Sequence, residues 1–169
     1  MSRESLKSHV FLSQILTPKR VYFGVLVCVL ICCLSIAAPP FLLNGNAGSR
    51  TLAGLIMLFY APTCHQMADR SFHIGGHAMA VCTRCTGIYT GFLLGCLVYP
   101  AIRRLRSGWH PRKALLLAVT PMLVDFTVTR AGIYPSTLLI RAATGLVAGG
   151  ICSVLLLPMI LDIFDDNHK

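Results

Sequence analysis

Four long apolar segments constrain this chain more than any other feature of its sequence. A helix needs about 20 consecutive apolar residues to cross the hydrocarbon core of a bilayer. The chain has 169 residues, of which only 12% are charged. We therefore predict an all-α integral membrane protein, a helical bundle of four spanning helices plus one short re-entrant or interfacial helix. The predicted spans are VYFGVLVCVLICCLSIAAPPFLL (21–43), AMAVCTRCTGIYTGFLLGCLVYPAI (78–102), KALLLAVTPMLVDFTVTRAGIY (113–134) and TLLIRAATGLVAGGICSVLLLPMILDIF (137–164).

A fifth apolar stretch, TLAGLIMLFYAP (51–62), is too short to span. As a helix it would be about 18 Å long, whereas the hydrocarbon core is about 30 Å thick. We expect it to form the re-entrant or interfacial helix. We also expect Pro39 and Pro40 to end or kink the first span, because proline interrupts helix hydrogen bonding.

Basic residues at the ends of the apolar segments predict the topology. Both basic clusters should be cytoplasmic, so an even number of crossings separates them. The N-terminus is then cytoplasmic in the cell inner (plasma) membrane, and the loop between 51–62 and the second span is extracytoplasmic. If 51–62 crosses with help from residues 63–66, that loop lies on the inner side instead. The clusters are Arg3, Lys7, Lys19 and Arg20, and Arg103, Arg104, Arg106, Arg112 and Lys113.

The same charge placement bears on the partners. The net charge is +9, but it lies at the segment ends, which favours the lipid bilayer and anionic lipid head groups over nucleic acid. We expect a basic N-terminus (1–20), one transmembrane domain (21–164) with a Cys/His loop at 63–85, and a short tail (165–169). Small residues in GIYTG and ATGLVAGG should let two helices approach closely. The sequence is also compatible with a homo-oligomer.

The segment CHQMADRSFHIGGHAMAVCTRC (64–85) carries the residues suited to chemistry. Cys82 and Cys85 are two residues apart, so both sulfurs can reach one metal ion or each other. They precede a predicted helix, and Arg84 lies between them. A helix N-terminus and a nearby cation both favour the thiolate form.

The leading hypothesis for this segment is a metal site with three sulfurs and one nitrogen, a ligand set suited to zinc. Four protein ligands would make the site structural. An open position would let zinc activate water for hydrolysis of a lipid-borne or small substrate, with His73 or His77 as general base. The Gly75-Gly76 pair argues against a helix through both histidines. The predicted ligands are Cys64, Cys82 and Cys85 with His65, or alternatively with His73 or His77.

An alternative hypothesis is thiol chemistry. A CxxC at the outer end of a transmembrane helix resembles the disulfide-forming quinone reductases and the vitamin K epoxide reductase group. That resemblance implies electron transfer between the CxxC, a second cysteine pair and a quinone. The loop here offers only Cys64 in place of a pair. The other cysteines (28, 32, 33, 96 and 152) fall in apolar segments, where we expect unreactive, buried thiols.

Charged residues within the predicted bundle form a further set of candidates. Asp125 lies in the middle of the third span, where an ionisable group usually faces a partner or a cavity. Arg141 is its expected partner, with Arg130 also within range. The pair would fix helix register, bind an anionic head group or relay a proton. A non-enzymatic accessory or transport subunit that uses Asp125 and Arg141 is a third hypothesis.

Two arginines lie close to the cysteines. Arg70 and Arg84 have the guanidinium groups that bind a phosphate or carboxylate. Asp69 is placed to neutralise one of them instead.

The run CHQ…RSF…G…VCTRCTGIYTG resembles a family of small prokaryotic membrane proteins known as domain of unknown function 2085. The resemblance covers roughly residues 51–150, and it implies a membrane location and a functional Cys/His site, with no established reaction. Phe126 stands where the family commonly has glycine. The resemblance continues through Pro121, Asp125, Gly132, Ser136, Arg141, Thr144, Gly145 and Gly149.

Overall fold

The computed structural model describes residues 17–103 and 111–165, and predictions that concern residues 1–16, 104–110 and 166–169 lie outside it. The described chain is almost entirely helical, so the predicted all-α class is confirmed. Its elements are α2 (Pro18–Ala37), α3 (Pro39–Leu42), α4 (Ala47–Tyr60), the short 3-10 helix η1 (Ala68–Arg70), β1 (His73–Ile74), β2 (His77–Ala78), α5 (Thr83–Ile102), α6 (Pro111–Arg130) and α7 (Leu138–Asp165).

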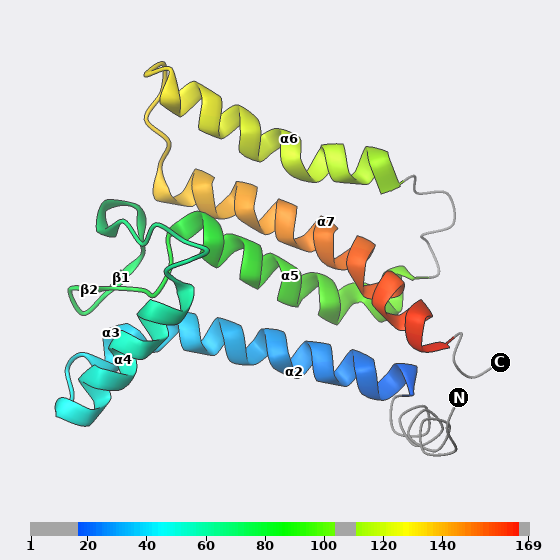
Figure 1. The fold of residues 1–169 in the computed structure, drawn as a ribbon. Coiled ribbons are helices and arrows are strands. Elements are labelled where there is room, and N and C mark those ends of the chain that lie inside the picture. Colours follow the sequence, from blue (N-terminus) through cyan, green and yellow to red (C-terminus); the bar gives the residue numbers. More distant parts are fainter. Residues whose placement is uncertain (1–16, 104–110, 166–169) are drawn as a thin grey trace, which may run out of the picture.

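Four long helices lie side by side; the neighbours α5 and α7 run parallel, whereas α2 is antiparallel to α5 and α6 is antiparallel to α7 (Figure 1). Helices α5 and α7 pack most closely at the centre, α2 packs on α5, and α6 packs on α7. Helices α3 and α4 and the β1–β2 hairpin gather at the end of the bundle where α2 ends and α5 begins. The loop of the predicted metal site therefore lies at one end of the helices, opposite the end at which α2 begins.

Three described helices are long and apolar enough to cross a membrane: α2, α5 and residues Leu138–Phe164 of α7. Helix α6 has 20 residues, but it is the least apolar of the long helices. Lys113, Asp125 and Arg130 lower its hydropathy. A membrane protein with helical spans is supported, and the fourth span predicted at 113–134 stays a prediction.

The prolines interrupt the first span as predicted, since α2 ends at Ala37 and α3 starts at Pro39. The short apolar helix begins earlier than the predicted 51–62, at Ala47, because the Asn46 side chain caps it by accepting a hydrogen bond from the Ser49 N–H at 3.0 Å. With 14 residues it is about 21 Å long, which is too short to span.

The two glycine-containing runs form the contact between α5 and α7. A methyl group added at Gly87 or Gly91 would collide with the backbone carbonyls of Ala142 or Leu146 in α7. Added at Gly149, it would collide with a backbone carbonyl of α5. Only glycine allows the two backbones to touch in this way, as in other small-residue helix interfaces. The predicted close approach is confirmed.

Candidate metal centre and its cavity

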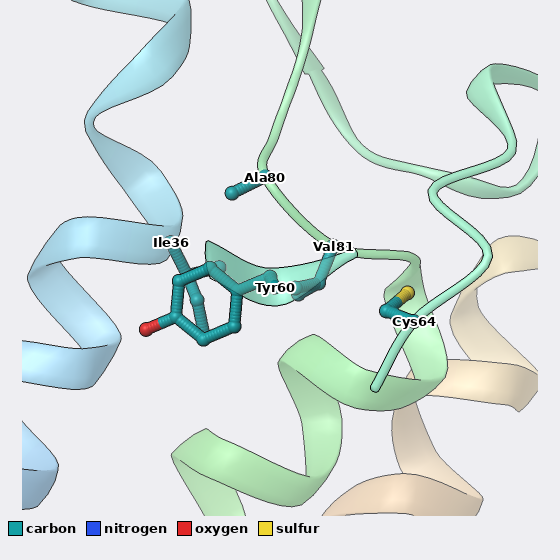
Figure 2. Close-up of a cluster of buried hydrophobic side chains, with 5 residues drawn as sticks. All are labelled: Ile36, Tyr60, Cys64, Ala80 and Val81. Carbon is teal, nitrogen blue, oxygen red and sulfur yellow. The ribbon is translucent and has the colours of Figure 1, made fainter. Parts of the chain in front are cut away.

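Cys64 is positioned by a buried cluster at the end of α4. Its backbone N–H donates to the Tyr60 carbonyl at 3.0 Å, which continues the helix by one turn. The Tyr60 ring is buried against Ile36 of α2 and Val81 (Figure 2). The Tyr60 hydroxyl lies 2.7 Å from the Ser35 hydroxyl. The apolar packing of α4 on α2 thus fixes the place of the first cysteine.

Gln66 connects this cysteine to the segment before the CxxC. Its side-chain amide donates to the carbonyls of Met57 at 2.6 Å and Ala80 at 2.8 Å. Its backbone has φ of +49°, a conformation that is uncommon for a residue other than glycine. Such local strain persists only where surrounding contacts over-determine it, and it clusters at functional sites. The glutamine therefore holds the two halves of the loop together.

The three cysteines come together at the start of α5. The Sγ atoms of Cys64, Cys82 and Cys85 all lie within 4.8 Å of one another. The Cys64 Sγ is buried and accepts hydrogen bonds from the backbone N–H of Cys82 at 3.2 Å and of Gln66 at 3.5 Å. This group of sulfurs could hold a metal ion.

Cys82 is the N-cap residue of α5. The pKa of its thiol is lowered to about 5, chiefly because the Cys85 thiol donates to it. The backbone amides of Cys85 and Arg84 and the side chain of Cys64 lower this pKa further, whereas burial opposes the shift. A thiolate at this position agrees with the predicted effect of the helix N-terminus.

The histidines are less close to the sulfurs than the cysteines are to each other. In the described ranges, no imidazole or carboxylate joins the three-cysteine group within 4.8 Å. His73 lies in the hairpin with Nδ1 3.0 Å from the Ser71 carbonyl, and His77 contacts Asn44 at 3.1 Å. Gly75 and Gly76 form the turn between them, both with positive φ, so the expected absence of a helix is confirmed.

A cavity of about 510 Å³ adjoins the sulfurs. Helices α5, α6 and α7 each contribute to its wall, with Met122 and Phe126 as the α6 residues. None of the described residues that line this wall has a carboxylate. Its polar or ionisable side chains are Thr63, Cys64, His65, Arg70, Cys82, Thr83, Arg84, Cys85 and Arg141.

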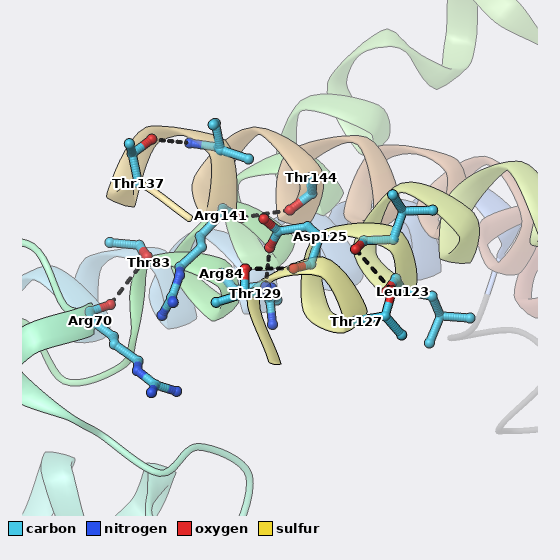
Figure 3. A network of polar contacts seen from close by, with 12 residues as sticks. Arg70, Thr83, Arg84, Leu123, Asp125, Thr127, Thr129, Thr137, Arg141 and Thr144 are labelled. Carbon is cyan, nitrogen blue, oxygen red and sulfur yellow. Dashed lines mark hydrogen bonds and ion pairs between the residues drawn. The ribbon is translucent and has the colours of Figure 1, made fainter. Parts of the chain in front are cut away.

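Asp125 pairs with Arg84 of α5 rather than with the expected Arg141 (Figure 3). The prediction of Arg141 as partner is wrong because α6 turns the carboxylate toward the first turn of α5. Asp69 neutralises Arg70, as the sequence suggested, with Oδ2 3.4 Å from the Arg70 Nε. That pair is exposed, whereas the Asp125 side chain is only 7% exposed.

Sequence reasoning did not single out Gln66, Met122 or the pairing of Arg84 with Asp125. The sequence did contain an indication that Gln66 is a site residue, because it is the third residue of the CHQ run that carries the family resemblance. The sequence contained no such indication for the apolar residues that α6 contributes to the cavity wall, since nothing in their local pattern differs from that of other helix residues.

Comparison with known proteins identifies a family and two similar chains. A family model described as predicted membrane protein (DUF2085) matches residues 64–155. An uncharacterised protein of Methanocaldococcus jannaschii is 40% identical over 155 residues, covering 89% of this chain and 99% of that protein. Another, of Methanothermobacter thermautotrophicus, is 33% identical over 98 residues, covering 56% of this chain and 85% of that protein. No solved structure gives a significant match. The region matched by the family model includes all three clustered cysteines and Arg141.

Proposed function

The chain belongs to the DUF2085 family of predicted membrane proteins, and we propose that it holds a zinc ion on Cys64, Cys82 and Cys85 at the membrane interface. The observation that carries this proposal is the mutual approach of three Sγ atoms within 4.8 Å. Tetrahedral zinc with Zn–S bonds of about 2.3 Å places its sulfurs about 3.8 Å apart. A small inward movement of the side chains therefore closes the site.

Cys64, Cys82 and Cys85 would hold the zinc through three sulfurs, which would leave a fourth position for water or substrate from the adjoining cavity. Three protein ligands with an open position are the arrangement of catalytic rather than structural zinc sites. A zinc ion bound there would supply Lewis acidity toward a water or substrate oxygen. His65 lines the same cavity, so we assign it the role of general base in hydrolysis of a lipid-borne or small substrate. His73 and His77 line other surfaces and have no part in the proposed reaction.

The proposal includes the topology of the site. Lys19 lies in the first turn of α2 and Arg103 directly follows α5. The start of α2 and the end of α5 lie at the end of the bundle opposite the start of α5 (Figure 1). By the positive-inside rule that end is cytoplasmic, with α6 as the fourth span and the cysteines at the extracytoplasmic face. Labelling of a cysteine placed at Gly76 with a membrane-impermeant maleimide in intact cells tests this side. Protection of that cysteine until the membrane is permeabilised would reverse the orientation.

Metal analysis of the purified full chain tests zinc binding. We expect about one zinc per chain by inductively coupled plasma mass spectrometry. Cys82→Ser and Cys64→Ser should each lose the zinc. Cys28→Ser is the matched control, because Cys28 is an exposed residue of α2 outside the three-cysteine group, and it should keep the zinc.

The same sulfur geometry favours one other function, thiol–disulfide exchange with a quinone as electron acceptor. Thiols this close can pair with each other after a small rotation. A free-thiol count separates the two functions: the redox protein would contain no zinc and would gain two thiols on treatment with dithiothreitol. A chain that has neither zinc nor a reducible disulfide would exclude both.

A further inference from the structure

Arg141 is a partly buried arginine whose side-chain Nε has no hydrogen-bond partner among the described residues. It lies in the first turn of α7, where its backbone N–H donates to the Thr137 carbonyl at 3.1 Å. Its side-chain Nε is buried and makes no hydrogen bond. Across residues 17–103 and 111–165, no carboxylate lies within 4.0 Å of this guanidinium. Because an unpaired charge next to a membrane is unfavourable, this side chain is suited to bind an anionic or polar ligand.

Arg84 offers a second set of donors in the same cavity. Its Nη2 is paired with Asp125, but its Nε is also buried without a hydrogen-bond partner. Both arginines line the cavity that contains the sulfurs, and their side chains extend to the same side of the helices (Figure 3). Asp69 neutralises Arg70, and Asp125 neutralises Arg84. Among the described arginines of this wall, Arg141 therefore has the charge that no carboxylate neutralises.

We propose that this cavity binds a phosphoryl group through Arg141 of α7 and the free Nε of Arg84, beside the three sulfurs. A guanidinium binds oxyanions through fork-like, charge-assisted hydrogen bonds. A phosphoryl group has enough oxygens to occupy two arginines and still leave one for the open metal position, whereas a carboxylate has only two. The inference names the substrate class of the proposed zinc site and in that respect rests on the proposed function.

The phosphoryl group has two sources with the same chemistry, a phospholipid head group and a free phosphate. Isothermal titration calorimetry of the full chain in a neutral detergent and phosphate-free buffer distinguishes them. One arm uses inorganic phosphate, and the other uses dihexanoyl phosphatidic acid below its micellar concentration. Each arm is run on the zinc-loaded protein and on protein treated with a chelator.

We expect saturable binding in at least one arm. Arg141→Gln should weaken it about tenfold or more, because charge-assisted hydrogen bonds are lost. Arg141→Lys keeps the positive charge but lacks the planar guanidinium that donates two parallel hydrogen bonds. Its affinity should lie between those of the unaltered chain and of Arg141→Gln. Arg130→Gln is the matched control: Arg130 is an exposed arginine at the end of α6 outside the cavity wall, and its replacement should change affinity less than twofold. Should Arg141→Gln not fold, Arg141→Lys alone decides.

Tighter binding in the lipid arm assigns the site to a head group, and equal or tighter binding of inorganic phosphate assigns it to a free phosphate. Binding that survives chelation and depends on Arg141 supports the anion site even if the zinc proposal fails. No binding in either arm, or binding that Arg141→Gln and Arg141→Lys leave unchanged, overturns the inference whatever the zinc content is.

Discussion

Arg84 in the first turn of α5 and Asp125 in the C-terminal half of α6 form an ion pair that joins two helices which each pack mainly on α7. The side chains are 22% and 7% exposed. The pair therefore holds α6 against the end of the bundle where the cysteines lie.

Asp125→Asn should destabilise the fold by about 3 kcal/mol, because it leaves the Arg84 charge largely buried without its partner. Thermal unfolding in detergent measures the change. Asp69→Asn removes the other described aspartate–arginine pair, which is exposed, and should change stability by less than about 1 kcal/mol. Equal effects of the two substitutions would mean that the Arg84–Asp125 pair does not hold α6.

Gly91→Ala should destabilise the protein by about 1–3 kcal/mol, because the added methyl group forces the α5 and α7 backbones apart. Gly24→Ala is its control within α2, where an added Cβ meets nothing within 4 Å. That change should be neutral or stabilise by up to about 1 kcal/mol, since alanine favours helix. Denaturation in a graded sodium dodecyl sulfate series compares them, and a Gly91→Ala protein as stable as Gly24→Ala would contradict the tight contact.

Gln66→Ala should loosen the metal loop, because the carbonyls of Met57 and Ala80 lose their donor. An unsatisfied buried group costs about 1–3 kcal/mol. Hydrogen exchange measured by mass spectrometry should show faster exchange across residues 64–82. Met67→Leu conserves volume at the adjacent, partly exposed position and should leave exchange there unchanged. Slow exchange in Gln66→Ala would show that the loop is held by other contacts.

Removal of the metal should lower the thermal unfolding temperature of the unaltered chain. A ligand that binds only the folded state adds to its stability, and zinc release requires protonation or loss of the thiolates. Treatment with a chelator should therefore lower Tm at neutral pH, and zinc should dissociate progressively as the pH falls. In Cys82→Ser the chelator should have no further effect on Tm. A chelator effect of equal size in that variant would place the metal elsewhere.

Local features of the fold could be predicted from the sequence because their causes are local. Pro39 and Pro40 end α2 by removing backbone donors. The glycines of GIYTG mark the contact with α7 because only a missing side chain allows backbones to touch. The place of the CxxC at a helix N-terminus follows from the apolar run after it. The fold class and the three-cysteine group were therefore within reach of the sequence.

The partner of Asp125 was not predictable, because it depends on how far α6 is rotated about its own axis. A rotation of one residue, about 100°, would turn the carboxylate away from Arg84. That rotation is set by the packing of α6 on α7, which the local sequence pattern does not specify. The same reason kept Met122 and Phe126 out of the predicted site. His73 and His77 are carried away from the sulfurs by a two-residue turn whose direction no spacing rule specifies.

The glycine contact between α5 and α7 has a consequence for how the cavity can change shape. Cys82 and Cys85 lie at the start of α5, and Arg141 lies in the first turn of α7. The glycine contacts fix these two helices relative to each other, so the cavity walls that carry the sulfurs and Arg141 cannot slide past one another. The rest of the described wall consists of Met122 and Phe126 of α6 and of residues from the loop before α5, so a widening that admits a bulky molecule would have to move α6 or this loop. Helix α6 packs on α7, and among the described residues the Arg84–Asp125 ion pair joins it to α5. A movement of α6 that widened the cavity would also have to break the Arg84–Asp125 ion pair.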